Sequence, residues 1–178
     1  VERSRGLGDV YKRQVFNRAR LIKNSKNRIP YGVDLIQKYK RESWIVFTEN
    51  KKQAKEFNKI INTKGFKSAL YNTDLDSTER LENLNKFKKA DLNVLVTCTA
   101  LDEGFDMPEA DGALILSASS SKRQRVQRMG RVLRITENKP NALIVTVYSS
   151  KTEFDKLMEE AKRYHKEGVP VSWKRQDR

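Results

Sequence analysis

The chain has 178 residues and carries 37 Lys and Arg against 23 Asp and Glu, which gives a formal net charge of +14 at pH 7. This length suits one α/β domain and is too short for two, and a hydrophobic fraction of 37% supports a packed core rather than disorder. One cysteine excludes an internal disulfide, one histidine argues against a metal site or a Ser-His-Asp triad, and no signal peptide or membrane-spanning run is present. We therefore expect a cytoplasmic protein without a metal site, whose charge predicts a polyanionic partner, most simply nucleic acid.

The N-terminal part of the chain is the most basic. Residues 1–44 hold 12 basic and 4 acidic residues, whereas residues 45–150 hold 17 and 13. Two interpretations stay open for this basic segment: a solvated helix or arm, or a footprint on nucleic acid. Residues 1–14 have no amphipathic period and resemble a translated adapter or assembly scar. We interpret them as a leader foreign to the protein and expect the chain to be a truncated reading frame.

Helical periodicity and short apolar runs alternate along the rest of the chain. Residues 15–41 have a helical pattern that Pro30 divides, with the second piece over about 31–40. The apolar runs predict five strands, at 44–48, 66–71, 92–97, 113–118 and 143–148. Further helices are predicted over 51–64, 76–89, 120–134 and 152–167. In the helix over 76–89, Leu81, Leu84 and Phe87 are expected to face inward.

The strands are apolar throughout, which is typical of a parallel sheet covered by helices on both faces. The fold class is therefore α/β. Ligands of such sheets bind beyond the carboxyl ends of the strands, so the loops after Thr48, Tyr71, Thr97 and Ala118 are the places to look for a site. The loop 71–74 either lines a nucleic-acid channel or forms a simple turn.

Residues 94–108 form the first segment that suggests chemistry. A buried strand runs into a loop that holds the carboxylates of Asp102, Glu103 and Asp106. At a strand end these groups can meet sugar hydroxyls, a metal or a cation, and Gly104 permits a close approach of the backbone to a ligand. An ordinary acidic turn explains the same residues.

Residues 122–134 form the second segment. On a helix, Gln127, Arg131 and Arg134 share one face, and two guanidinium groups one turn apart are suited to binding an anion. A solvated basic helix would explain the charge. It would not explain Gly130, which is unfavourable inside a helix, or the shared Gln and Arg face.

In this order and spacing, the segments resemble the second RecA-like domain of superfamily-2 helicases and translocases, the helicase conserved C-terminal domain. Residues 45–48 look like motif IV, residues 97–108 like motif V, and residues 127–134 like motif VI, with the pattern Q-R-x-G-R-x-x-R. The phrase over 100–108 is most similar to DEAD/DEAH-box members of the type III restriction and XPB-type branch. The resemblance covers about residues 15–165.

The resemblance implies a division of the chain and a RecA-like, P-loop NTPase-type fold. Residues 15–43 would be a basic helical interdomain segment, residues 44–168 the RecA-like domain and residues 169–178 a tail. Arg131 and Arg134 would be arginine fingers that reach the γ-phosphate of ATP. Further contacts to the nucleotide would come from Gly104, Asp106, Gln127 and Arg128.

The resemblance also implies contacts to a nucleic-acid backbone. Thr48 and Lys51 would make such contacts after the first strand. The position that carries Thr in the family's motif V falls on Cys98 here, so the contact from that motif would come from Thr97 or Thr99.

The sequence contains no G-x-x-x-x-G-K-[ST] phosphate loop. ATP with Mg²⁺ would therefore be bound mainly by an N-terminal RecA-like domain that this chain lacks, and we expect the chain alone neither to hydrolyse ATP nor to unwind a duplex. Two alternatives stay open: a non-catalytic nucleic-acid-binding module, and part of the motor subunit of a restriction or remodelling complex. The sequence does not distinguish DNA from RNA.

Overall fold

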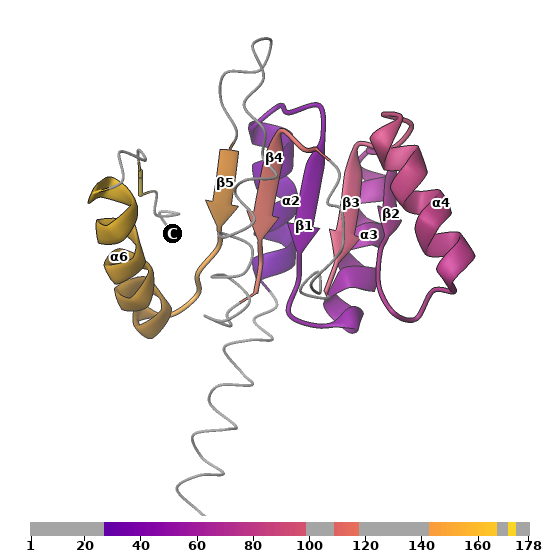
Figure 1. Ribbon diagram of the computed structural model, residues 1–178. Coiled ribbons are helices and arrows are strands. Elements are labelled where there is room, and N and C mark those ends of the chain that lie inside the picture. The colour runs from indigo at the N-terminus through magenta and orange to yellow at the C-terminus, as the bar shows by residue number, and fades with distance from the viewer. Residues whose placement is uncertain (1–26, 99–108, 118–142, 167–170, 174–178) are drawn as a thin grey trace, which may run out of the picture. The chain divides into compact units, whose positions relative to one another are not determined.

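The computed structural model describes residues 27–98, 109–117, 143–166 and 171–173 (Figure 1). The helices are α2 (Arg28–Lys38), α3 (Lys51–Thr63), α4 (Ser77–Lys88) and α6 (Lys151–Lys166). The strands are β1 (Trp44–Phe47), β2 (Ser68–Leu70), β3 (Val94–Thr97), β4 (Gly112–Ile115) and β5 (Leu143–Thr146). Among the described helices, none combines the length and the apolarity needed to cross a membrane.

The five strands form one sheet in the order β2-β3-β1-β4-β5, and every neighbouring pair is parallel. Phe47 at the end of β1 pairs with Thr97 on one side and with Ile115 on the other. Three strands therefore end at the same level. The predicted parallel α/β sheet is confirmed, although the paired segments are shorter than the apolar runs.

The strands β1, β3 and β4 are buried on both faces, and alternate residues of each strand point to opposite faces of the sheet. On one face, Trp44, Val46 and Val96 belong to a core with apolar residues of α2 and α3. On the other face, Ile45, Phe47 and Leu95 belong to a second core with residues of α4. Figure 1 shows α2 and α3 together on one side of the sheet.

Two details of the predicted helices differ from the structure. The helix predicted over about 31–40 begins earlier, at Arg28, so Pro30 lies in its first turn, where a backbone N–H has no helical partner to lose. The helical piece predicted before Pro30 lies mostly outside the described residues. Leu81 is 57% exposed, whereas Leu84 and Phe87 are buried as predicted. The reason is angular, because Leu81 lies about 120° around the helix from Phe87.

Residues 148–178 form a compact unit separate from residues 1–147. Glu153 fixes the beginning of α6: its carboxylate accepts a hydrogen bond from Ser149 N at 2.8 Å, and its own N–H donates to Ser150 Oγ at 3.2 Å. Phe154 contacts two other aromatic rings, with centroid distances of 5.2 Å to Tyr148 and 5.2 Å to Trp173.

Candidate functional site

The carboxyl ends of β1, β2, β3 and β4 lie at one edge of the sheet, which we call the carboxyl edge. The connections after Thr48 and Tyr71 begin there, as expected for a parallel sheet, whereas the loop after Thr97 lies outside the described residues from residue 99 on. The loop after Ala118 lies outside the described residues. The described part of the carboxyl edge therefore consists mainly of the β1–α3 and β2–α4 connections.

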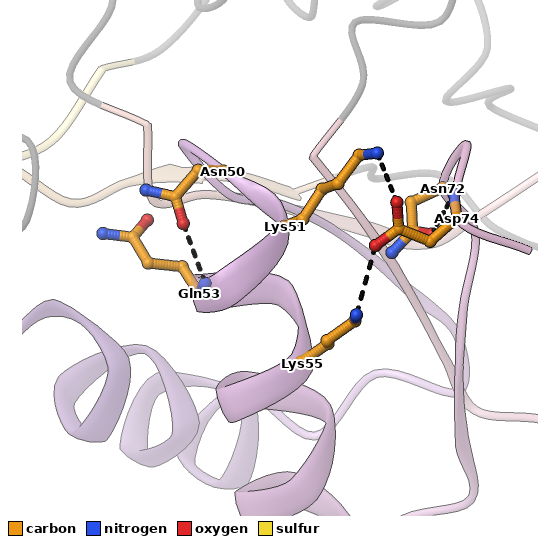
Figure 2. A network of polar contacts seen from close by, with 6 residues as sticks. All are labelled: Asn50, Lys51, Gln53, Lys55, Asn72 and Asp74. Carbon is orange, nitrogen blue, oxygen red and sulfur yellow. Dashed lines mark hydrogen bonds and ion pairs between the residues drawn. The ribbon is translucent and has the colours of Figure 1, made fainter.

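The β1–α3 connection is fixed by reciprocal capping. Asn50 is the N-cap of α3, and its side chain accepts a hydrogen bond from Gln53 N at 3.0 Å. Gln53 Oε1 in turn accepts from Glu49 N at 3.1 Å. Figure 2 shows Asn50 and Gln53 at the start of the helix, next to Lys51. The capping thus fixes the backbone from which the Lys51 side chain extends.

The first turn of α3 carries positive charge where the helix dipole disfavours it. Lys51 and Lys52 occupy this turn, and it contains no acidic residue. Cations are destabilising near a helix N-terminus. These two charges therefore do not stabilise α3 itself.

Thr48 and Thr97 join the first and third strands. Thr48 N donates to Thr97 O at 2.8 Å, and the Thr48 hydroxyl lies 3.3 Å from Thr97 O and 3.2 Å from Asn50 O. Both threonines are 1% exposed. In this structure they hold the edge together, and their contact with a nucleic-acid backbone stays a prediction.

Two lysines of α3 converge on one carboxylate of the β2–α4 connection (Figure 2). Lys51 Nζ forms an ion pair with Asp74 Oδ1, and Lys55 Nζ lies 3.1 Å from Asp74 Oδ2. The hydrogen bond from Lys51, and then that from Lys55, holds the pKa of Asp74 below its usual value. The carboxylate is therefore ionised at neutral pH, and a single anion is shared by two cations.

The residues before Asp74 form a turn with one unsatisfied group. Asp74 N donates to Asn72 Oδ1 at 3.0 Å, which makes this part of the loop an Asx turn. Asn72 is 1% exposed, and within the described part of the chain its Nδ2 has no hydrogen-bond acceptor. Leaving such a buried donor without an acceptor lowers the free energy of unfolding by about 1–3 kcal/mol.

Burial raises the pKa of the neighbouring Tyr71, and the charge of Arg80 opposes this rise, so the phenol stays protonated at neutral pH.

Two further contacts tie the ends of β4 and β5 to other elements. Ser117 Oγ donates to the Glu49 carboxylate and so links the end of β4 to the β1–α3 connection. Arg28, which is 2% exposed, donates from one guanidinium nitrogen to Leu116 O at 3.1 Å and Val147 O at 3.0 Å. A buried arginine of α2 thus binds backbone carbonyls of two adjacent strands at once.

The structure places none of the predicted nucleotide and catalytic residues. Outside the described residues lie Gly104, Asp106, Gln127, Arg128, Arg131 and Arg134, together with the predicted nucleic-acid contact Thr99. Within the described ranges, no group of three or more His, Cys, Asp or Glu is arranged to hold a metal ion.

Sequence reasoning did not assign the shared carboxylate of Asp74, the second lysine at position 55 or the buried Arg28. A weak signal exists for the lysine pair, since Lys51 and Lys55 are four residues apart on a predicted helix and therefore share a face. Nothing local indicates that Asp74, which lies 23 residues from Lys51, is their partner.

Comparisons with known proteins agree on one family. The model of the helicase conserved C-terminal domain matches residues 27–136. The DNA 3'-5' translocase XPB2 of Sulfurisphaera tokodaii is 36% identical over 129 residues, which cover 72% of this chain and 28% of that protein. The UvrABC system protein B of Fusobacterium nucleatum is 31% identical over 125 residues, 66% of this chain and 19% of that protein. The chain thus spans less than a third of the length of these relatives.

Solved structures agree with the fold. The C-terminal domain of the DEAD-box protein Dbp5 superposes with a TM-score of 0.67 at 21% identity, covering 82% of each chain. The helicase domain of Hef from Pyrococcus furiosus gives a TM-score of 0.55 at 22% identity, covering 74% of this chain and 28% of that one. At these identities the likeness establishes the fold alone, a RecA-like parallel sheet with helices on both faces.

Proposed function

The chain belongs to the helicase conserved C-terminal domain family of superfamily-2 helicases and translocases, and from that premise we propose that it is the C-terminal motor domain of an ATP-dependent nucleic-acid helicase or translocase. The observation that carries this proposal is the family match over residues 27–136, a range that contains all the residues of motifs IV, V and VI.

We propose that the nucleotide site is composite. ATP with Mg²⁺ is bound mainly by an N-terminal RecA-like domain, and Arg131 and Arg134 of this chain stabilise the charge that develops in phosphoryl transfer. An arginine finger of this kind contributes about 10³–10⁵ in rate. The donor chemistry of motif VI fits an anionic triphosphate, because its arginines and its glutamine offer many N–H groups. The remaining nucleotide contacts in the proposal are Gly104, Asp106, Gln127 and Arg128.

We propose that the carboxyl edge holds the backbone of a nucleic-acid strand. Lys51 supports this because its side chain is 46% exposed and begins at a capped helix terminus. Thr48 and Thr97 lie at adjacent strand ends of the same edge, and Thr99 follows two residues later in the sequence. Contacts to phosphates give little sequence preference and a strong dependence on salt.

The test of the motor proposal is Arg131→Ala in the full-length protein. We expect the nucleic-acid-stimulated ATPase to fall by about 10³-fold or more, because the developing charge loses its guanidinium, while nucleic-acid affinity stays within about twofold. Arg163→Ala is the matched control, since Arg163 is an exposed arginine of α6 outside the proposed site. An ATPase that survives Arg131→Ala would contradict the finger assignment.

A further inference from the structure

Asp74 forms ion pairs with Lys51 and Lys55 in the arrangement that a phosphate group could also form. Each carboxylate oxygen has its own cation, with Lys51 on Oδ1 and Lys55 on Oδ2 at 3.1 Å. Two non-bridging oxygens of a phosphodiester could take the same two positions. Figure 2 shows both lysines extending from one side of α3 toward this carboxylate.

The ion pairs are of a kind that exchanges easily. The side chains of Lys51, Lys55 and Asp74 are 46%, 60% and 35% exposed, so solvent screens the attraction and water can replace either partner. The anion also comes from outside α3, because Asp74 belongs to the β2–α4 connection and the first turn of α3 has no acidic residue. The lysines can therefore keep their positions on α3 when Asp74 leaves.

The turn that carries Asp74 is not fully satisfied. Asn72 accepts from Asp74 N with its oxygen, but its buried Nδ2 has no acceptor among the described residues. A turn with such an unsatisfied donor loses less by rearranging than a fully bonded turn would. The carboxylate can thus be displaced without disrupting a complete network.

We propose that Lys51 and Lys55 form a two-lysine site for one phosphodiester group of a nucleic-acid strand, and that Asp74 fills this site when no strand is bound. The inference rests on the proposed nucleic-acid binding and adds two residues to it: Lys55 as a phosphate contact and Asp74 as an internal competitor. As a competitor, Asp74 weakens the binding of the nucleic-acid strand. It also makes the affinity depend less on salt, because the lysines release the Asp74 carboxylate rather than counterions when the phosphate binds.

The test compares Asp74→Asn with the unchanged 178-residue chain. Asparagine at position 74 keeps the backbone N–H that donates to Asn72 Oδ1, and it removes only the negative charge of the side chain. Binding of labelled oligo(dT) and oligo(U) of about 12 nucleotides is followed by fluorescence anisotropy between about 50 and 200 mM NaCl. We expect Asp74→Asn to bind about five- to tenfold more tightly at the lowest salt, with the slope of log K against log salt steeper by about 0.7 per freed lysine.

Glu82→Gln is the matched control. It changes the net charge equally and removes another exposed carboxylate with a lysine partner, Lys86 at 2.6 Å, but on α4. We expect the control to stay within about twofold of the unchanged chain. Adding Lys51→Gln and Lys55→Gln to the Asp74 variant should abolish its gain. A thermal-unfolding midpoint like that of the unchanged chain shows that each variant is folded.

The outcomes separate the two proposals. If the unchanged chain binds the oligonucleotides and Asp74→Asn binds them no better than Glu82→Gln, the role of Asp74 as a competitor is overturned and the proposed function stands. If the gain survives loss of both lysines, the two-lysine site is overturned. If neither chain binds either strand, the nucleic-acid contact of the proposed function fails and the phosphodiester assignment fails with it. A gain specific to Asp74 that needs both lysines supports the inference.

Discussion

The two ends of β1 have opposite surroundings. At its amino end, Trp44 is completely buried in the core with α2 and α3. At its carboxyl end, Thr48 leads within three residues to Lys51, whose side chain is 46% exposed and paired with a charge on another loop. The amino end is held by close packing, whereas the connection that follows the carboxyl end carries an ion pair that solvent can reach. The packing that stabilises β1 and the proposed binding residue Lys51 thus lie at different ends of the strand.

The close packing at the amino end can be broken without touching the carboxyl edge. A Cβ added at Gly112 would lie 2.6 Å from an atom of the Trp44 ring. We expect Gly112→Ala to lower the free energy of unfolding by about 2–3 kcal/mol, because the rigid indole has no room to move. Urea unfolding measures this loss.

Gly32→Ala is the control for that crowding. Its added Cβ would lie 2.9 Å from the end of the flexible Leu116 side chain, and alanine also favours the helix. We expect a change of less than about 1 kcal/mol. Equal losses for the two variants would contradict the view that the Trp44 end is the rigid one.

The capping at the carboxyl end gives a smaller effect that also reaches binding. Asn50→Ala removes the side-chain cap of α3, and we expect unfolding to become easier by about 1 kcal/mol. Nucleic-acid affinity should fall as well, because the backbone that carries Lys51 is less well fixed. The matched control is Asn85→Ala, an exposed asparagine inside α4, which should leave both quantities nearly unchanged.

The smallest expected effect is the acid titration of Asp74. Its pKa is lowered in the folded protein, so its ion pairs are complete above the ordinary pKa of 3.8 and are lost as the pH falls through the folded value. Because Lys51 is the larger cause, Lys51→Gln should raise this pKa more than Lys55→Gln does. Carboxyl-carbon NMR measures the titration, and the reverse order would contradict the geometry.

The sequence predicted the fold better than it predicted the carboxyl edge. Apolar runs such as 44–48 and 92–97 are typical of strands in a buried parallel sheet, so local composition was sufficient to predict them. The angular position of Leu81 depended on where α4 meets the sheet, which composition does not specify. The pairing of Lys51 with Asp74 depended on which loops meet in space, and that follows from the strand order rather than from any local pattern.

The buried Arg28 has a mechanical consequence. Its guanidinium joins the first turn of α2 to Leu116 O and Val147 O, and residues 127–134, which contain the two proposed arginine fingers, lie between these two carbonyls in the sequence. A displacement of the helix start must therefore break two buried hydrogen bonds or carry both strand ends along with it. The start of α2 is thus coupled through one side chain to two carbonyl groups that flank the arginine-rich segment in the sequence.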